Sequence, residues 1–525
     1  MAIKKLILVS AISGLLTACG GGGDVNISPS NVDNSVDNST TTDGGTSLNG
    51  VCARYTKDGV VFEGALEAGD CTYSKDFVDI TNPLTVDVTF PSIGTGRHIF
   101  DGSLVVGQSF SNDADLASAG IVQGGSPSDY AAKITIQAGN TFVFKTTEDY
   151  AVINRGSQIF AEGTASAPIT FTSYSDAVSG TVAFDDVQQW GGMIINGFGV
   201  TNKCKYTGVR GADLAKDLAA SPTGCHVAAE GKSGSAQTYY GGDNDADNSG
   251  VLSYFIVKHT GAEVSPGNEL NGIAFGGVGS GTQVSNLQVF STYDDGIEMF
   301  GGAVDVTNFV ALYVRDDSFD VDEGYIGTLE NALIIQAADN GQQCIESDGI
   351  GSYQDTETVR NADLIARGLN SAAVVNNMTC IISGHQEGTH GDSVGVRIRE
   401  AHAITINDSI ITTALTDNDG LDECLRIDDA ETRTAGFVTI TNTLLACEKP
   451  FNDATVQIGS AAIGTWFANA DEDNLVESTN GAQTITALNG YFSTGTRGAV
   501  ATDDDWTAGW TVGLDSDDLW VQPAP

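Results

Sequence analysis

The sequence predicts an all-β protein folded as a parallel β-solenoid, with about 22–23 residues in each regular coil. The first observation is a repeated asparagine in similar strand-like segments, spaced 22 and 23 residues apart: Asn286, Asn308 and Asn331. The second is a repeated acidic turn with the same two spacings, beginning at Asp294, Asp316 and Asp339. Because two separate features share one period, the repeat indicates a single structural unit.

The third observation is the content of each repeat. Short runs of β-forming residues alternate with Gly, Asn and Asp, and no helical periodicity is present. Leucine-rich repeats have a similar length, but their consensus is absent. We expect the repeated asparagines to stack as a side-chain ladder at a corner of the coil rather than to carry chemistry.

The first 18 residues read as a bacterial lipoprotein signal peptide. Lys4 and Lys5 precede an apolar run over residues 6–16, and Leu16-Thr17-Ala18-Cys19 matches the lipobox. The match implies cleavage before Cys19 and lipid on its thiol, which would hold the protein to a membrane. An ordinary secretory signal with a chance cysteine is the alternative. Gly20, by resemblance to sorting in Gram-negative bacteria, favours the outer membrane, on its periplasmic or its cell-surface face.

Residues 19–50 are expected to form a disordered tether, since Gly20 to Gly50 contains no aromatic and no basic residue to build a core.

The whole chain is strongly acidic, with a formal net charge of −44 at pH 7. This charge argues against nucleic acid and bare anionic lipid as direct partners. Its simplest role is solubility, and an acidic polymer would approach only through a bridging cation.

Eight cysteines remain after the lipidated one, and an even number in an exported protein predicts disulfides. Pairing of sequence neighbours is the simplest connectivity. It joins Cys52 to Cys71, Cys204 to Cys225, Cys344 to Cys380, and Cys424 to Cys447. No CxxC motif occurs, so zinc and thioredoxin-type chemistry have little support.

The remaining chain divides into three parts. Residues 51–130 do not repeat and are expected to cap the N-terminal edge of a β-helix over residues 131–460. Residues 461–525 are expected to form a C-terminal cap. Four of the five tryptophans lie in this last part, as an apolar cap or, alternatively, as an aromatic sugar platform: Trp466, Trp506, Trp510 and Trp520.

Several strings together resemble a family of exported bacterial lipoproteins with a pectate-lyase-like right-handed parallel β-helix. They include Trp190-Gly191-Gly192, Tyr240-Gly241-Gly242, Asn271-Gly272-Ile273, Asp294-Asp295-Gly296 and, near the C-terminus, Trp506-Thr507-Ala508-Gly509-Trp510. The resemblance covers roughly residues 130–515. It implies the fold and an exported location, but the family has no settled biochemical activity.

The strongest candidate for chemistry is a stack of acidic side chains. A shift of 22 residues places Glu298 over Asp320 and Phe300 over Asp322. Their apolar neighbours should face inward, so Glu298 and Asp320 should point outward, with adjacent coils about 4.8 Å apart. Three interpretations stay open: a solvated ladder, a calcium site, or an acid–base pair. Glu298, Asp320 and Asp322 are therefore weak catalytic candidates.

Calcium is the one cofactor that the sequence suggests. One loop offers carboxylates at alternate positions: Asp243, Asp245 and Asp247. The densest group is Asp316, Asp317, Asp320, Asp322 and Glu323, and residues 417–423 form a similar acidic loop. The loop that begins at Asp243 is not an EF-hand, because Asn248 and Tyr254 occupy the positions that need Gly and Glu. Hydrated turn residues are the alternative interpretation.

Other catalytic signatures are weak or absent. His385 and His390 are five residues apart and do not form HExxH. A β-elimination lyase would need a basic residue, for which Arg315, Arg397 and Arg399 are available, although an Arg beside an Asp is usually an ion pair. No Walker A, GxGxxG or GxSxG motif occurs, so no nucleotide or organic cofactor is expected.

These features favour a cell-envelope module that binds a glycan, a matrix or another surface component without being an enzyme. The alternatives are a calcium-dependent polysaccharide lyase or glycoside hydrolase, and a purely structural envelope protein. An enzyme would hold Glu298, Asp320 or Asp322 in a cleft between the insertions at 200–250 and 350–400, beside a basic residue. A binder would present an open face without perturbed carboxylates.

Overall fold

The computed structural model describes residues 51–121, 131–231, 233–264, 268–338, 340–383, 394–413, 422–477 and 486–522. The chain divides into two units, Met1–Leu48 and Asn49–Pro525, and all described residues belong to the second. Among them, no helix is both long and apolar enough to cross a bilayer. The predicted signal peptide, Cys19, the tether, His385 and His390 all lie outside the described residues.

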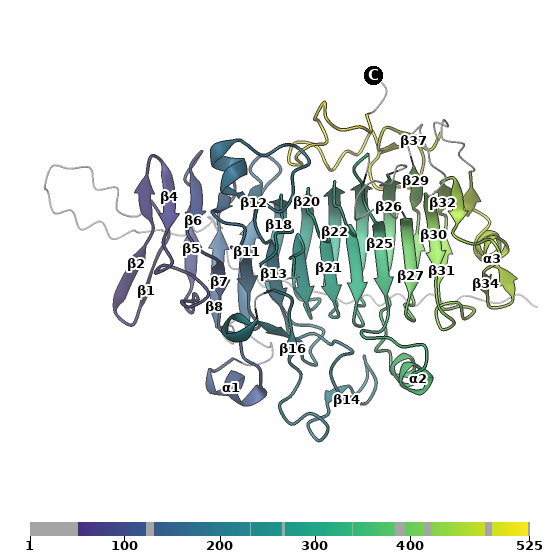
Figure 1. The fold of residues 1–525 in the computed structure, drawn as a ribbon, viewed down its shortest axis with the longest axis horizontal. Coiled ribbons are helices and arrows are strands. Elements are labelled where there is room, and N and C mark those ends of the chain that lie inside the picture. Colours follow the sequence, from purple (N-terminus) through teal and green to yellow (C-terminus); the bar gives the residue numbers. More distant parts are fainter. Residues whose placement is uncertain are drawn as a thin grey trace, which may run out of the picture. The chain divides into compact units, whose positions relative to one another are not determined.

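The second unit is a parallel β-helix, as the repeat predicted (Figure 1). One wall is a ten-stranded parallel sheet of β7 (Leu104–Val106), β10 (Ala151–Ile153), β13 (Met193–Asn196), β19 (Ile273–Gly276), β21 (Ile297–Phe300), β23 (Phe319–Asp322), β25 (Gln343–Asp348), β27 (Val394–Arg399), β30 (Glu423–Ile427) and β33 (Lys449–Phe451). We call it the first sheet. Successive strands along the chain are neighbours in this sheet, which is the signature of a solenoid.

The other walls come from an eighteen-stranded sheet. Its strands are β3 (Ala65–Glu67), β4 (Asp70–Tyr73), β5 (Val88–Phe90), β6 (Arg97–Phe100), β8 (Ala132–Ile136), β9 (Thr141–Phe144), β11 (Ser157–Glu162), β12 (Ile169–Ser173), β18 (Gly250–Lys258), β20 (Gln283–Phe290), β22 (Asp305–Leu312), β24 (Thr328–Ile335), β26 (Val374–Ile382), β28 (Thr405–Asn407), β29 (Ile410–Thr413), β31 (Thr439–Thr441), β32 (Leu444–Ala446) and β36 (Leu475–Val476).

The remaining elements are small. Two-stranded antiparallel pairs are β1 (Arg54–Lys57) with β2 (Val60–Glu63), β14 (Tyr206–Thr207) with β15 (Ala215–Lys216), β16 (Val227–Ala228) with β17 (Tyr239–Tyr240), β34 (Gln457–Ile458) with β35 (Ala461–Ala462), and β37 (Leu488–Asn489) with β38 (Phe492–Ser493). The α-helices are α1 (Asp113–Ser118), α2 (Thr358–Ala366) and α3 (Ile463–Ala470). In Figure 1, α1, β14 and α2 lie on one side of the coils, outside the sheets.

The predicted coil length is confirmed by the strand register. Val284 of β20 pairs with Val306 of β22, and Val306 pairs with Leu329 of β24. Alternate residues of each strand face the interior, where they form one continuous apolar core along the coils.

The predicted asparagine ladder is also confirmed. Asn286, Asn308 and Asn331 each bend their strand through a positive φ of 52°, 59° and 57°. Asparagine tolerates this left-handed conformation better than most residues, which explains why it recurs at this corner. Asn331 Nδ2 donates to Asn308 Oδ1 at 3.0 Å, and Asn377 Nδ2 donates to Asn331 Oδ1 at 3.2 Å.

All four predicted disulfides are present, with S–S distances of 2.01, 1.97, 2.19 and 2.03 Å. Cys344 lies in β25 and Cys380 in β26, so the disulfide between them crosses the interior from one wall to the other. Cys204 and Cys225 lie instead in the long insertion that follows β13.

The β-helix begins before residue 131, the predicted start. β4 pairs in parallel with β6, β6 with β9, and β7 with β10, so residues from about 70 onward already belong to the coils. These first strands have only three or four residues and turns of unequal length. A fixed period was therefore not visible in the sequence.

The C-terminal part differs from the predicted cap over residues 461–525. Phe467 of α3 is buried in the central core at the last coils. Residues 486–522, by contrast, run back along the outside of the eighteen-stranded sheet, where the Val512 amide donates to Gln288 Oε1 at 2.7 Å. Trp510 is buried in this contact, which is packing and not an open sugar platform.

Candidate functional site

The outward face of the first sheet carries two columns of side chains whose character changes along the coils. The register aligns, in the first column, Val105, Val152, Ile194, Ala274, Glu298, Asp320, Glu346, Arg397 and Arg426. The second column contains Asn196, Gly276, Phe300, Asp322, Asp348 and Arg399. The face therefore passes from apolar through acidic to basic.

We call the five acidic residues of these columns the acidic strip: Glu298, Asp320, Glu346, Asp322 and Asp348. The predicted stacking of Glu298 on Asp320 is confirmed by the pairing of β21 with β23. Glu346 and Asp348 were missed by the sequence reasoning. Asp320 pairs with Glu346 at a spacing of 26 residues, so a shift of 22 residues does not find them.

The acids of the strip point outward, as predicted, but the structure covers Glu298, which has only 8% of its surface exposed. Asn271 Nδ2 donates to Glu298 Oε2 at 2.5 Å, and Glu230 of the insertion is its strongest charged neighbour. The idea of a fully solvated ladder is therefore wrong for Glu298, because the insertion folds over the strip.

Burial dominates the electrostatics of the strip. It raises the pKa of Glu298, Asp320 and Asp322 well above the ordinary carboxyl value, and neighbouring carboxylates raise it further. The Oδ1 atom of Asp320 is buried and has no hydrogen-bond partner among the described residues. Ligand oxygens of Asp295, Glu298 and Asp320 all lie within 4.8 Å of one another, a spacing that would suit a shared cation.

Basic residues close the strip at its end on β27. Arg399 donates to Glu346 at 2.8 Å and to Asp348 at 2.5 Å. Arg397 lies 3.3 Å from Glu346 and 3.1 Å from Asp428. Both arginines, which the sequence offered as bases for a lyase, are therefore engaged in ion pairs.

The acidic turns before β21 and β23 have a structural role. Asp295 Oδ1 accepts the backbone N–H of Asp317 at 3.0 Å, and Asp317 Oδ1 accepts that of Gln343 at 2.7 Å. These carboxylates thus tie consecutive coils together. Asp294 and Asp316 lie beside them, with ligand atoms of Asp294, Asp295 and Asp316 within 4.8 Å of one another.

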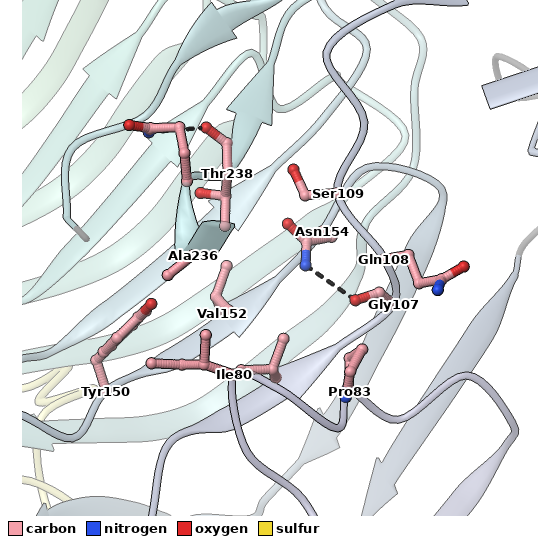
Figure 2. Close-up of a pocket in the computed structure, with 12 residues that line it drawn as sticks. Ile80, Pro83, Gly107, Gln108, Ser109, Tyr150, Val152, Asn154, Ala236 and Thr238 are labelled. Carbon is pink, nitrogen blue, oxygen red and sulfur yellow. Dashed lines mark hydrogen bonds between the residues drawn. The ribbon is translucent and has the colours of Figure 1, made fainter. Parts of the chain in front are cut away.

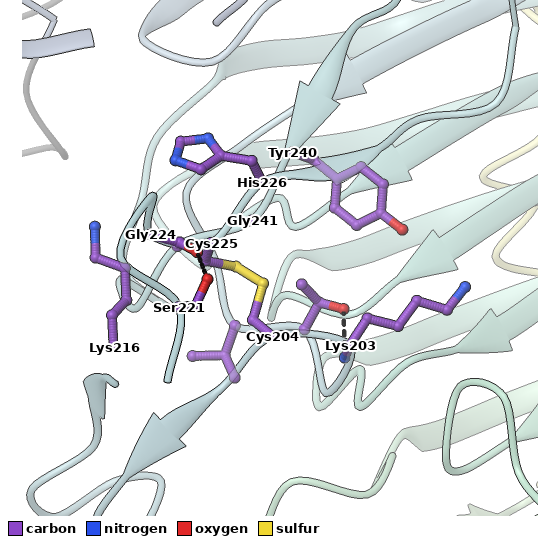
Figure 3. The surroundings of a disulfide bond; sticks show 12 residues. Lys203, Cys204, Lys216, Ser221, Gly224, Cys225, His226, Tyr240 and Gly241 are labelled. Atoms are coloured by element: carbon purple, nitrogen blue, oxygen red, sulfur yellow. Dashed lines mark hydrogen bonds between the residues drawn. A yellow bond between two sulfur atoms is a disulfide. The ribbon is translucent and has the colours of Figure 1, made fainter. Parts of the chain in front are cut away.

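Glu323 joins the insertion to the end of the strip. It is fully buried, and Oε2 accepts hydrogen bonds from Tyr240 and Thr201, each at 2.7 Å. Lys203 forms an ion pair with its other oxygen. Figure 3 shows the Lys203 amine and the Tyr240 hydroxyl extending away from the Cys204–Cys225 disulfide, which fixes this part of the insertion.

The other predicted calcium loop does not join the strip. Arg210 binds both carboxylate oxygens of Asp245 at 2.7 Å, so this acid is neutralised by protein. Asp243 accepts the N–H of Lys216 at 3.2 Å, and Asp247 accepts that of Phe198 at 2.9 Å. Residues 417 and 419 lie outside the described residues.

The fold and this site define a parallel β-helix protein with a partly buried, carboxylate-rich face on its first sheet. Residues 111–511 match the family model described as a pectate-lyase like beta helix domain. The chain therefore belongs to the pectate-lyase-like β-helix family, and this membership indicates a carbohydrate-related role. No curated protein and no solved structure matches the chain.

Proposed function

We propose that this protein is a carbohydrate-binding module of the bacterial envelope, in which the acidic strip holds calcium and the bound cation contacts an acidic glycan. The single observation that carries the proposal is Asp320. Its buried Oδ1 has no hydrogen-bond partner in the part of the chain that the structure describes, and carboxylates stack on Asp320 from both adjacent coils.

The energetics favour a cation at this place. Two like charges on adjacent coils, about 4.8 Å apart, repel by roughly 3 kcal/mol at an effective dielectric constant near 20. Arg397 and Arg399 offset this repulsion at Glu346 and Asp348, but neither ion-pairs with Glu298. A hard divalent cation with several oxygen ligands would offset it at the Glu298 and Asp320 end.

A cation also reconciles the charge of the chain with a carbohydrate ligand. With a net charge of −44, the protein repels acidic polysaccharides unless a cation bridges them. We further propose that lipid on Cys19 holds the β-helix to the outer membrane, where such glycans occur.

Isothermal titration calorimetry with calcium, followed by polygalacturonate or alginate with and without calcium, tests the proposal. We expect the wild type to bind calcium and to bind the acidic glycan only in its presence. Asp320→Asn should lose both activities, whereas Glu472→Gln, which removes an exposed acid outside the strip, should retain them. Absence of calcium binding, or equal binding by both variants, would contradict the proposal.

A second candidate function is acid–base cleavage of a polysaccharide. The observation that favours it is the raised pKa of Glu298 and Asp320, which lie on adjacent coils as a potential proton donor and acceptor and depart from the unperturbed carboxylates expected of a binder. A screen of acidic and neutral polysaccharides for new reducing or unsaturated ends tests this activity. Product that is formed by the wild type and lost in Glu298→Gln would establish it.

A further inference from the structure

An open pocket of about 500 Å³ lies beside the ends of β22 and β24 in the eighteen-stranded sheet. Tyr313, which follows β22, and residues 337–338, which follow β24, form one part of its lining. Residues 183–185, from the connection between β12 and β13, form a second part. The C-terminal run adds Asp518 and Trp520, so segments that are distant in sequence meet at this pocket.

Three of the lining residues are aromatic, and two of their rings form a corner. The ring centroids of Phe184 and Tyr313 lie 5.1 Å apart, with the ring planes at 80° to each other. Planes that are nearly perpendicular present two ring faces around one corner, and Trp520 adds a third, partly exposed ring to the lining. Because the face of an aromatic ring is its electron-rich side, such a corner attracts a cation.

The polar atoms of these aromatic residues are engaged within the protein. Trp520 Nε1 donates to the carbonyl of Gln336 at 2.9 Å, and the Tyr313 hydroxyl donates to the carbonyl of Asp518 at 3.3 Å. The rings therefore offer a ligand their faces and C–H edges rather than hydrogen-bond donors. A carboxylate or phosphate, which needs donors or a positive charge, finds neither among the side chains of the described lining.

The charge of the pocket is negative. Asp185 and Asp518 both line it and are exposed, and within the described parts of the chain neither carboxylate forms an ion pair. Arg315 donates to the backbone carbonyl of Asp185 at 3.2 Å rather than to its carboxylate. The described lining contains no Lys, Arg or His, and the net charge of −44 adds a long-range attraction for cations.

Aromatic faces beside carboxylates select a chemical class of ligand. Ring faces recognise quaternary ammonium groups, and nearby carboxylates add a direct attraction between opposite charges. A calcium ion would find two carboxylates here, although it takes about six to eight oxygen ligands. We propose that this pocket binds a methylated ammonium ion, of the kind that choline carries.

The cavity beside β7 and β10 lacks this combination (Figure 2). No charged residue stands in its described lining, and its aromatic residue, Tyr150, is only 1% exposed. The acidic strip lies on the first sheet and shares no residue with the aromatic pocket. Ammonium binding is therefore a function beyond the proposed calcium-dependent one and does not depend on it.

Calorimetry on the full-length chain in the presence of a chelator tests the proposal with two probes, choline and its neutral carbon isostere 3,3-dimethylbutan-1-ol. The two molecules have nearly the same shape and differ in charge. We expect choline to bind and the isostere to bind at least tenfold more weakly, because the ring faces and carboxylates act on the charge. Choline binding should also weaken as the salt concentration rises.

Phe184→Leu tests the aromatic corner, since leucine keeps an apolar side chain but has no ring face. We expect it to weaken choline binding about three- to tenfold, which is the range for one cation–π contact. Phe451→Leu is the matched control. Phe451 is also a partly buried ring packed edge to face, here against Phe467 at the last coils, and it does not line the pocket.

Asp518→Asn tests the charge without disturbing the rings and should weaken choline binding at least threefold. Asp517→Asn removes the same charge one residue away, outside the lining, and should have a much smaller effect. Asp320→Asn should bind choline as the wild type does, which separates this proposal from the fate of the calcium site. The proposal is overturned if choline does not bind, if the neutral isostere binds equally well, or if Phe184→Leu and Asp518→Asn bind as tightly as their controls.

Discussion

Glu298 and Asp320 occupy the same register position on adjacent coils, and burial raises the pKa of both carboxyl groups. Neither residue is near the other in sequence, and neither ion-pairs with Arg397 or Arg399, which neutralise Glu346. The two carboxyl groups therefore lack the direct arginine ion pairs that Glu346 and Asp348 form.

The stability of the protein without calcium should depend on pH through Asp320. A carboxyl group whose folded pKa is raised keeps its proton longer in the folded than in the unfolded state. It therefore costs stability as the pH rises above the unfolded value of about 3.9. In chelator, Asp320→Asn should become progressively more stable than the wild type between pH 4.5 and pH 7.5, as measured by urea unfolding.

Asp453→Asn provides the control for this pH series. Asp453 is fully exposed, and its hydrogen bonds with Thr455 lower its pKa, so its contribution is lost as the pH falls and has the opposite sign. A stability difference for Asp320→Asn that stays constant or shrinks with rising pH would contradict the raised pKa.

Replacing Asn331 should separate backbone strain from the side-chain ladder. Asn331→Ala removes the amide hydrogen bonds to Asn308 and Asn377 and puts alanine, which tolerates the left-handed conformation less well than asparagine, at a positive φ. We expect a loss of about 2–3 kcal/mol in the free energy of unfolding. Asn331→Gly removes the same hydrogen bonds but relieves the strain, because glycine adopts the left-handed conformation freely. Its loss in the free energy of unfolding should therefore be about 1 kcal/mol smaller than that of Asn331→Ala. Equal losses would show that the conformation costs alanine nothing here.

The Lys203–Glu323 pair should hold the insertion on the coils. Lys203→Met leaves Glu323 buried with its charge unpaired, although Tyr240 and Thr201 still donate to it. Because the Lys203 side chain is 36% exposed, we expect a loss of about 1–3 kcal/mol rather than the full value for a buried pair.

A double-mutant cycle provides the control for this pair. Lys203→Met with Glu323→Gln should recover part of the stability, since no buried charge then lacks its partner. Losses that simply add in the double variant would show that the two side chains are not coupled.

The anchor is tested by Cys19→Ala. Loss of the thiol removes the site of acylation, so the variant should no longer incorporate labelled palmitate and should leave the membrane fraction. Cys52→Ser serves as the control because Cys52 pairs with Cys71 and should not affect lipid incorporation. Membrane association that persists in Cys19→Ala would refute lipid anchoring at this residue.

The sequence by itself determined the solenoid, its coil length and the asparagine corner, and it made the pairing of neighbouring cysteines, which the structure has, the simplest connectivity. These features share a physical origin, because a parallel β-helix repeats local geometry. Asn308 and Asn331 meet the same backbone requirement one coil apart, and cysteines that are neighbours in sequence become neighbours in space. Because the same local geometry recurs in each coil, the residues that it requires recur in the sequence with the period of the coil.

Only the tertiary structure decided which acids act together and which are neutralised. Turns of unequal length bring Glu346 and Asp348 into the strip, and the insertion places Glu230 over Glu298 and Arg210 on Asp245. Desolvation and ion pairing depend on these long-range contacts, which no spacing encodes. The sequence could therefore name Glu298 and Asp320, but their raised pKa comes from burial in the folded coils and, for Glu298, from Glu230 of the insertion as well.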